Sequence, residues 1–204
     1  MKKPNFESTL PTSYRVAVAL DARRGRFALM LTLLSFLLTA LVAVPLLIPV
    51  LLRPDAFASW NLLLFYAVLF GGYIAYMLLH ELVHGAVYKM MTRQRLTFGL
   101  SWNCAFCGVP RIFTYRRCAL TATLAPFVLF SIVLAPLLPL ALGNVSVYFG
   151  VAMLYALHIG GCSGDLYVAG LLLLRYRDPR MLMNDTGPAM TLYIPDESAE
   201  EVSV

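Results

Sequence analysis

The chain has 204 residues, of which 60% are hydrophobic and 13% are charged, and its mean hydropathy is +0.74. These values lie outside the range of ordinary soluble domains and indicate a membrane protein. The net charge of +5 is not accompanied by a stretch of interleaved basic and aromatic residues, so we expect no nucleic-acid partner.

Four apolar stretches are long enough to cross a bilayer, which takes about 20 helical residues. They cover roughly residues 27–52, 60–88, 118–142 and 145–174. The first is too long for a cleaved signal peptide. We therefore predict an all-α membrane protein with about four transmembrane helices. Its integral membrane domain spans residues 26–180, between an N-terminal segment, 1–25, and a C-terminal tail, 181–204, whose acidic end is expected to be disordered.

Basic residues predict the orientation, because Lys and Arg are retained on the cytoplasmic side of a membrane. Six precede the first span, six lie at or between the ends of the second and third, three follow the fourth, and Arg53 alone falls on the opposite side. We expect a multi-pass protein of the cell membrane with both termini in the cytoplasm, short outer loops near 53–59 and 143–144, and a cytoplasmic loop over residues 92–117.

The cytoplasmic loop contains two short apolar runs, "RLTFGL" and "GVPRIFTY", separated by a Cys-rich turn. This pattern predicts a small membrane-proximal β-hairpin. Its edge can accept an extended substrate segment as an added strand, or the hairpin can simply plug the loop against the bilayer. "TLYIP", residues 191–195 of the tail, is also strand-like and is a candidate to pair with the same edge.

Five ionisable groups fall within the predicted spans, and they include all three histidines of the chain: His80, Glu81, His84, His158 and Asp165. Each costs about 2.5 to 3.5 kcal/mol on insertion scales, so it is expected to have a function or a partner. A single histidine in this position often only hydrogen-bonds a neighbouring helix. Five such groups together favour a functional site.

The spacing of the first three groups indicates a metal site. His80 and His84 are four residues apart, which places both imidazoles on one face of a helix, with Glu81 beside them. In zinc hydrolases with this His-Glu-x-x-His arrangement the histidines bind Zn²⁺ and the glutamate handles the proton of the metal-bound water.

A catalytic zinc takes three protein ligands and keeps one position open, so a third ligand is required. No Glu lies between Glu81 and Glu197, which excludes a downstream glutamate ligand, and no metzincin-type third histidine follows His84. The remaining candidates, His158 and Asp165, lie in a span interrupted by glycines, and irregular backbone at that depth is tolerated where it lines protein or a cavity.

Depth in the membrane distinguishes the two candidates. Asp165 lies ten residues before Arg175, a distance from the cytoplasmic interface comparable to that of His80 and His84, whereas His158 would lie about 10 Å deeper. We predict His80, His84 and Asp165 as zinc ligands, and His158 as a group that supports the ligands or the transition state. The alternatives are that Asp165 caps a helix N-terminus and that His158 is a packed polar residue.

The cysteines give weaker indications of metal binding. Cys104 and Cys107 have zinc-pair spacing, but the sequence has no second pair to complete a structural site. Cys162 lies three residues before Asp165 and is a candidate for a fourth, inhibitory zinc ligand. On the cytosolic side the thiols are expected to be reduced.

"HELVHG" on the second span, "LAPF" on the third and "GGCSGDLY" on the fourth resemble the core segments of the site-2 protease class of intramembrane metalloproteases. The short length, the loop up to "LAPF" and the tail "MNDTGPAMTLYIP" are similar to the small bacterial zincin peptidase family of DUF3267 type. The resemblance implies substrate-positioning roles for Pro126 and Gly164. Ala125-Pro126 replaces the Gly-Pro of the larger proteases, and their Leu-Asp-Gly motif is absent.

The resulting hypothesis is a zinc-dependent intramembrane endopeptidase that hydrolyses membrane-anchored or membrane-proximal proteins near the cytoplasmic face. Glu81 would accept a proton from water and deliver it to the leaving amine. Its partners are a membrane protein or peptide substrate and the lipid bilayer; the sequence does not indicate an oligomeric state. The alternative is a non-proteolytic zinc-binding membrane protein, a pseudoenzyme scaffold or a transporter, although such a site has no use for Glu81 at the cost of its insertion.

Overall fold

The computed structural model describes residues 4–23, 25–52, 60–100 and 105–196. The expectations for the outer loop at 53–59, for Cys104 and for the acidic end of the tail after residue 196 lie outside the described residues.

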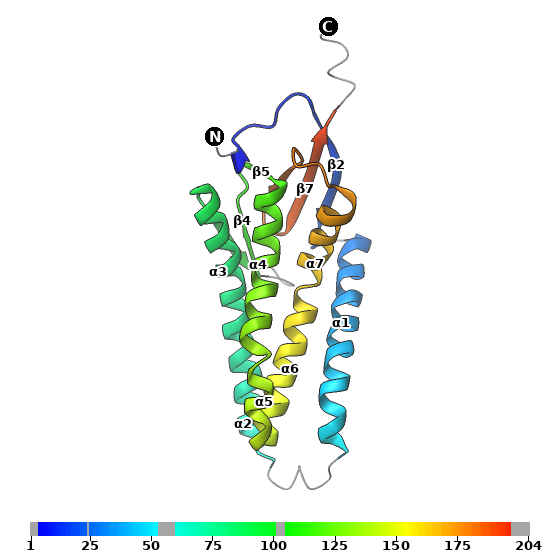
Figure 1. Ribbon diagram of the computed structural model, residues 1–204, viewed down its shortest axis with the longest axis vertical. Coiled ribbons are helices and arrows are strands. Elements are labelled where there is room, and N and C mark those ends of the chain that lie inside the picture. Colours follow the sequence, from blue (N-terminus) through cyan, green and yellow to red (C-terminus); the bar gives the residue numbers. More distant parts are fainter. Residues whose placement is uncertain (1–3, 24, 53–59, 101–104, 197–204) are drawn as a thin grey trace. The chain divides into compact units, whose positions relative to one another are not determined.

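Four helical runs among the described residues are long and apolar enough to cross a membrane, and each agrees with a predicted span to within a few residues. The first is α1 (Gly25–Leu51). The others combine several elements (Figure 1): α2 (Leu62–Tyr66), the π-helical turn η2 (Ala67–Gly71) and α3 (Gly72–Thr92); α4 (Arg116–Leu134), α5 (Leu137–Leu140) and the 3₁₀ turn η3 (Ala141–Gly143); and α6 (Val145–Gly161), α7 (Ser163–Gly170) and the π-helical turn η4 (Leu171–Arg175).

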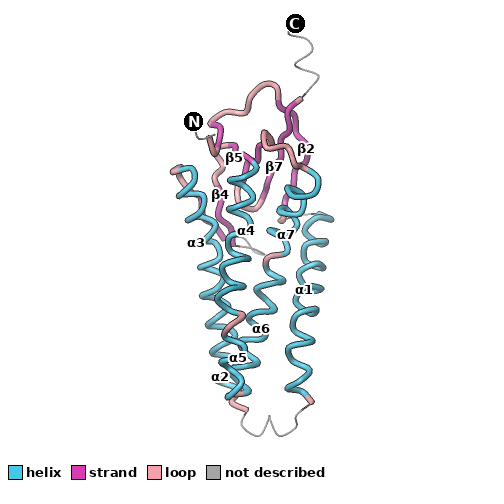
Figure 2. Tube along the Cα trace, in the orientation of Figure 1, coloured by secondary structure: helices cyan, strands magenta, loops and turns pink. Residues whose placement is uncertain are grey.

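The chain also forms a five-stranded antiparallel sheet, so the prediction of an all-α protein with only a small hairpin is wrong (Figure 2). The strands, in their order across the sheet, are β1 (Phe6–Glu7), β5 (Phe113–Tyr115), β6 (Leu182–Asp185), β7 (Ala189–Pro195) and β2 (Tyr14–Asp21). Each pairing except the β6–β7 hairpin joins distant parts of the sequence. Hydropathy over a local window contains no information on such pairings.

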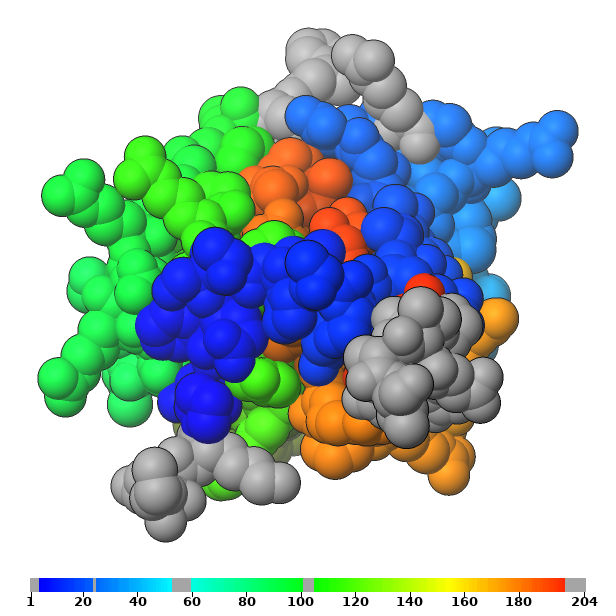
Figure 3. Space-filling model, turned by 90° about the horizontal axis from the view of Figure 1, so that it is seen from above, coloured from blue at the N-terminus to red at the C-terminus, as the bar shows by residue number. Residues whose placement is uncertain are grey.

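The longest pairing in this sheet joins the N-terminal segment to the C-terminal tail. β2 and β7 pair from Tyr14 opposite Pro195 to Asp21 opposite Ala189, with a bulge between Val16 and Val18. Figure 3 shows the dark blue N-terminal segment against the red C-terminal strand. The N-terminal segment and the C-terminal tail, which were predicted to lie outside the membrane domain, therefore pair with each other in one sheet.

The predicted hairpin exists, but with a different second strand. β3 (Thr97–Leu100) pairs with β4 (Ala105–Gly108), whereas Phe113–Tyr115, expected in the hairpin, is β5 of the larger sheet. "TLYIP" is a strand, as predicted, but it lies within β7 between β6 and β2. Its expected pairing with the hairpin edge is wrong, because both of its edges are already hydrogen-bonded.

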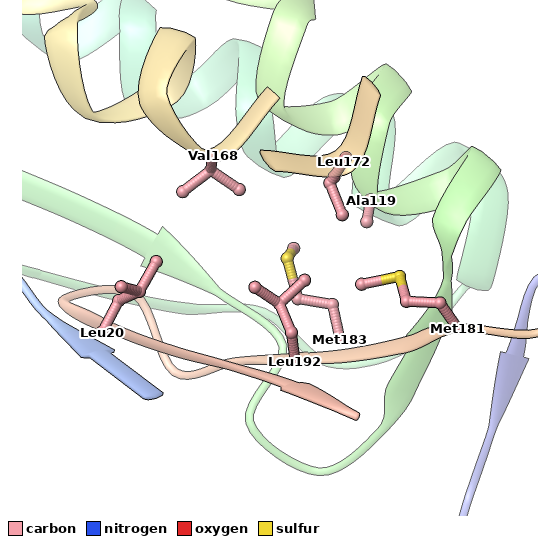
Figure 4. Packing of buried hydrophobic residues seen from close by; sticks show 7 residues of the cluster. All are labelled: Leu20, Ala119, Val168, Leu172, Met181, Met183 and Leu192. Carbon is pink, nitrogen blue, oxygen red and sulfur yellow. The ribbon is translucent and has the colours of Figure 1, made fainter. Parts of the chain in front are cut away.

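The described residues form two compact units. The sheet unit combines Met1–Leu29, Glu81–Ala125 and Asp165–Val204. Its main core packs helix residues against the sheet (Figure 4): Leu20, Ala119, Val168, Leu172, Met181, Met183 and Leu192. Strands β2, β6 and β7 thus bury their apolar face against the part of α4 that belongs to this unit and against α7 and η4.

The helix unit combines Met30–His80 and Pro126–Gly164. Small residues allow its helices to approach closely, as is typical of helices in membranes. A Cβ atom on Gly160 of α6 would overlap the Thr39 hydroxyl and the Ser35 backbone oxygen of α1. The glycine-rich break predicted in the fourth span is narrow: α6 continues through Gly161, and Cys162 alone separates it from α7.

Candidate metal centre

Helix α3 carries the His-Glu-x-x-His sequence on a continuous stretch of 21 residues. Because the helix is unbroken between them, His80 and His84 lie one turn apart on the same face. Both histidines are 8% exposed. The helix contributes to both units, with His80 in the helix unit and Glu81 and His84 in the sheet unit.

In the sheet unit His84 has a partner at each ring nitrogen. Its Nδ1–H donates to the backbone carbonyl oxygen of Ala122 in α4 at 2.9 Å. Its Nε2 lies 3.5 Å from Oδ2 of Asp165, and both side chains are largely buried. Asp165 is the third residue of α7 and does not precede the first turn as a helix N-cap would. The structure thus brings Asp165 to the histidine predicted to share a metal with it.

The separation of these two atoms fits a shared zinc ion. Zinc binds imidazole nitrogen and carboxylate oxygen at about 2.0 to 2.2 Å, and a tetrahedral angle then places the two ligand atoms about 3.4 Å apart. The distance from His84 Nε2 to Asp165 Oδ2 is 3.5 Å. A histidine whose Nδ1–H is held by a carbonyl presents Nε2 to a metal, which is the usual arrangement at zinc sites.

In the helix unit the Tyr76 hydroxyl joins two histidines. Its oxygen is 3.0 Å from Nδ1 of His80 and 3.1 Å from Nδ1 of His158. Nε2 of His158 is 3.2 Å from the Ser131 hydroxyl. Tyr76, His80 and His158 are all buried, so these contacts replace hydrogen bonds to water.

The Tyr76 hydroxyl has one proton and can donate to only one of the two imidazoles. If His80 binds a metal through Nε2, its Nδ1–H donates to Tyr76, and Tyr76 then donates to Nδ1 of His158. This leaves the proton of neutral His158 on Nε2, which donates to Ser131. One chain of hydrogen bonds therefore connects His158 to His80, and the supporting role of His158 stays a prediction.

Cys162 adds a soft donor to the same region. Its Sγ lies 3.8 Å from the Tyr76 hydroxyl and 3.7 Å from Nδ1 of His158. Ligand atoms of His80 and Cys162, both in the helix unit, come within 4.8 Å of each other. The donors available to a metal are therefore imidazole, carboxylate and thiol groups, which zinc accepts.

A second buried polar pair joins Tyr88, on α3 one turn beyond His84, to Asp185 at the end of β6. The Tyr88 hydroxyl donates to Oδ2 of Asp185 at 2.6 Å, and the Gly187 backbone N–H donates to Oδ1 at 2.8 Å. Burial raises the pKa of Asp185 to about 6, although both hydrogen bonds favour its ionised form. In the neighbouring hairpin, burial and the charges of Asp185 and Glu81 raise the pKa of the Cys107 thiol to about 12.

The two residues predicted to position a substrate are Pro126 and Gly164. Pro126 is fully buried inside α4. Gly164 lies in the first turn of α7, where an added Cβ would meet Leu31 at an ordinary van der Waals distance. Their substrate-positioning roles stay predictions. Sequence reasoning missed the Ala122 carbonyl and Tyr76, although Tyr76 precedes His80 by four residues and hence shares its helix face.

The sequence His-Glu-x-x-His on a helix is a pattern typical of zinc metalloproteases, in which the glutamate is the general base. Residues 73–178 match the model of the DUF3267 family, which is described as "Putative zincin peptidase". The match covers more than half of the chain, and the chain belongs to this family. Comparisons with curated proteins and with solved structures found no match.

Proposed function

We propose that the protein is a zinc-dependent intramembrane endopeptidase that cleaves membrane-anchored or membrane-proximal proteins near the cytoplasmic face. His80, His84 and Asp165 would hold the zinc ion. The observation that carries this proposal is the 3.5 Å separation of His84 Nε2 and Asp165 Oδ2, combined with the position of His80 one turn away on the same helix face. Family membership supports the same chemistry.

When bound, zinc would supply a Lewis acid that makes water acidic enough to ionise near neutral pH. Glu81 is the residue that accepts the water proton and later delivers it to the leaving amine. In the His-Glu-x-x-His pattern of zinc metalloproteases, the glutamate that follows the first histidine is the general base. A carboxylate in a span is costly, and proton transfer gives Glu81 a role that a purely metal-binding site does not need.

A peptide substrate must expose its carbonyl groups before it can be hydrolysed, because a helix keeps them in its own hydrogen bonds. Among the described strands, β3 pairs only with β4, and its exposed residues include Phe98 and Leu100. The outer edge of β3 is therefore our candidate for binding an extended segment by strand addition. The neighbouring strand β4 includes Cys107, and the negative charge of Glu81 contributes to the raised pKa of its thiol.

A second candidate function follows from Cys162. A zinc ion held by His80, His84, Asp165 and the Cys162 thiolate would have four protein ligands. Zinc sites with four protein ligands are structural, whereas catalytic sites keep one position open. The proximity of Cys162 to His80 within the helix unit favours a non-proteolytic zinc-binding protein if the thiolate binds permanently.

The experiment that tests the proposed function compares wild type with Glu81→Gln. Both proteins would be purified in detergent for zinc analysis, and membranes that contain each would be compared by labelling of new protein N-termini. We expect about one zinc per chain in both proteins. New N-termini near the cytoplasmic ends of membrane proteins should appear only with wild type.

Glu7→Gln is the matched control, because Glu7 is a glutamate of the sheet whose side chain accepts a hydrogen bond from Tyr115. It should retain both zinc and cleavage. Identical N-termini from wild type and Glu81→Gln membranes would refute the peptidase proposal. If cobalt-substituted wild type shows a thiolate-to-metal absorption band that Cys162→Ser lacks, and no cleavage is found, the four-ligand alternative holds.

A further inference from the structure

Helix α4 contains a proline in its interior, Pro126. Proline has no backbone N–H, so it cannot donate the hydrogen bond that position 126 would otherwise give to the carbonyl four residues earlier. That carbonyl belongs to Ala122. Carbonyl groups released in this way within membrane helices have to be satisfied by neighbouring helices, side chains or water.

The Ala122 carbonyl is the acceptor for His84. Nδ1–H of His84 donates to it at 2.9 Å, and Ala122 is completely buried. Water is therefore not the partner of this oxygen; the imidazole of α3 is. Pro126 and Ala122 are four residues apart in the same helix, α4, which sets their relative positions. Ala122 and His84 both belong to the sheet unit.

We propose that Pro126 positions His84 for metal binding by keeping the Ala122 carbonyl available to Nδ1–H of His84. This hydrogen bond fixes the proton on Nδ1 and turns Nε2 toward Asp165. The inference rests on the proposed function, because it assigns His84 as a zinc ligand through Nε2. Pro126 is thus a positioning residue that acts through a backbone atom of another residue.

A purely structural role for Pro126 makes a different prediction. A proline in a helix interior weakens the helix, so Pro126→Ala should then leave the protein as stable or more stable and should not affect zinc. In our proposal Pro126→Ala introduces a backbone N–H that competes with His84 for the Ala122 oxygen. Loss of the outer partner of a metal-binding histidine typically costs 10- to 100-fold in metal affinity. We expect a loss near the lower end, about tenfold, because a carbonyl oxygen has two lone pairs to share.

Pro45→Ala is the matched control, since Pro45 is also a proline inside an apolar helix, α1. Zinc affinity of the full-length proteins would be measured in detergent by competition with a chelator. We expect Pro45→Ala to bind zinc as wild type does and Pro126→Ala to bind it about tenfold more weakly. Equal affinity of all three proteins would overturn the inference.

Nitrogen-15 NMR of histidine-labelled, zinc-loaded protein gives a second readout that does not depend on activity. The chain has only three histidines, so His84 can be assigned by substitution. We expect wild-type His84 to bind zinc through Nε2 and to keep a hydrogen-bonded proton on Nδ1. In Pro126→Ala this proton signal should move toward that of a weaker hydrogen bond.

Zinc on Nδ1 of His84 in wild type would overturn the inference even if Pro126→Ala fails to fold. A wild-type chain that binds no zinc would refute the proposed function instead. In that case the Nδ1–H signal of His84 in metal-free wild type, Pro45→Ala and Pro126→Ala still tests the hydrogen bond to Ala122. An unchanged signal in Pro126→Ala would then refute the role of the proline.

Discussion

The Tyr76 hydroxyl is the group whose removal tests the hydrogen-bond chain behind His80 most directly. Tyr76→Phe keeps the aromatic ring, which packs edge-on against His80, Phe130 and His158, and deletes only the oxygen. The hydrogen bonds at 3.0 Å to His80 and 3.1 Å to His158 disappear, together with the weaker contact at 3.8 Å to Cys162 Sγ. The substitution therefore separates hydrogen bonding from packing.

The cost can be bounded from these two hydrogen bonds. The hydrogen bond to His158 joins α3 to α6, and such bonds between membrane helices contribute on average about 0.6 kcal/mol. With a similar contribution from the bond to His80, which lies within α3, the pair contributes about 1 kcal/mol. A buried nitrogen left without a partner costs about 1 to 3 kcal/mol. The Cys162 thiol, 3.7 Å from Nδ1 of His158, is a weak substitute donor for one of the two nitrogens. We expect Tyr76→Phe to lower the free energy of unfolding of the metal-free protein by about 1 to 3 kcal/mol.

Zinc affinity should fall separately from stability. If His80 binds zinc through Nε2, Tyr76 is the partner that orients its ring, and losing such a partner typically costs 10- to 100-fold in affinity. Unfolding would be followed in detergent with increasing SDS, and zinc affinity by chelator competition. Tyr73→Phe is the control, because Tyr73 lies on the same helix with its ring 6.1 Å from that of Tyr76.

Equal zinc affinity for Tyr76→Phe and Tyr73→Phe would refute the reasoning about His80. A double variant adds a further check on the chain of hydrogen bonds. If His158 acts through Tyr76, His158→Gln should weaken zinc binding in wild type but add little to Tyr76→Phe. Fully additive losses would show that the two residues act independently.

Two further predictions concern the aspartates of the sheet unit. Asp165→Ala should lower zinc affinity by more than about 100-fold, because losing even a residue that only hydrogen-bonds a metal ligand costs 10- to 100-fold in affinity. Full zinc occupancy of Asp165→Ala in competition assays would remove Asp165 from the ligand set. Asp178→Ala, which breaks a surface pair with Arg180, is the control. Burial raises the pKa of Asp185 from 3.8 to about 6, so the folded state keeps a proton that the unfolded state loses between about pH 4 and 6. The free energy of unfolding of the metal-free protein should therefore fall by about 3 kcal/mol as pH rises through that window, and Asp185→Asn should remove this fall; parallel pH profiles of the two proteins would contradict the prediction.

The four long apolar helical runs were predictable because their signal is local. Mean hydropathy over about 20 residues locates a span wherever its partners lie, and the four observed runs end within a few residues of the predicted ones. His80, Glu81 and His84 were predictable for the same reason, since a spacing of four residues on a helix specifies a common face without knowledge of the rest of the fold.

The sheet was not predictable from local patterns. "YRVAVALD" of β2 alternates in hydropathy at several positions, but its partner β7 lies more than 160 residues further along the chain. The loop over residues 92–117 illustrates the same limit. Its segment Phe113–Tyr115 is extended, as predicted, but it pairs with β1 and β6 and not within the predicted hairpin. Extended conformation has a local signal, whereas the choice of a partner strand depends on how the whole chain packs.

The burial of Asp185 could not be predicted from the sequence. "MNDTGP" is typical of an exposed turn, since Asn, Asp, Gly and Pro all favour turns. The side chain is nevertheless 3% exposed, because Tyr88 and the Gly187 backbone N–H supply its hydrogen bonds. A local sequence indicates that a residue can form a turn, and only the packed structure reveals whether that turn is covered.

The two histidines of α3 are held by different kinds of partner, and this decides which substitutions can report on them. The partner of His80 is a side-chain hydroxyl, which Tyr76→Phe removes. The partner of His84 is the backbone oxygen of Ala122, which every residue at position 122 would also provide. A side-chain substitution at 122 therefore leaves the acceptor in place, although His84 contacts that residue directly. Substitution of Pro126 adds a backbone N–H that competes for the Ala122 oxygen, although that oxygen belongs to another residue. Zinc affinity should therefore be more sensitive to substitutions at position 126 than at position 122.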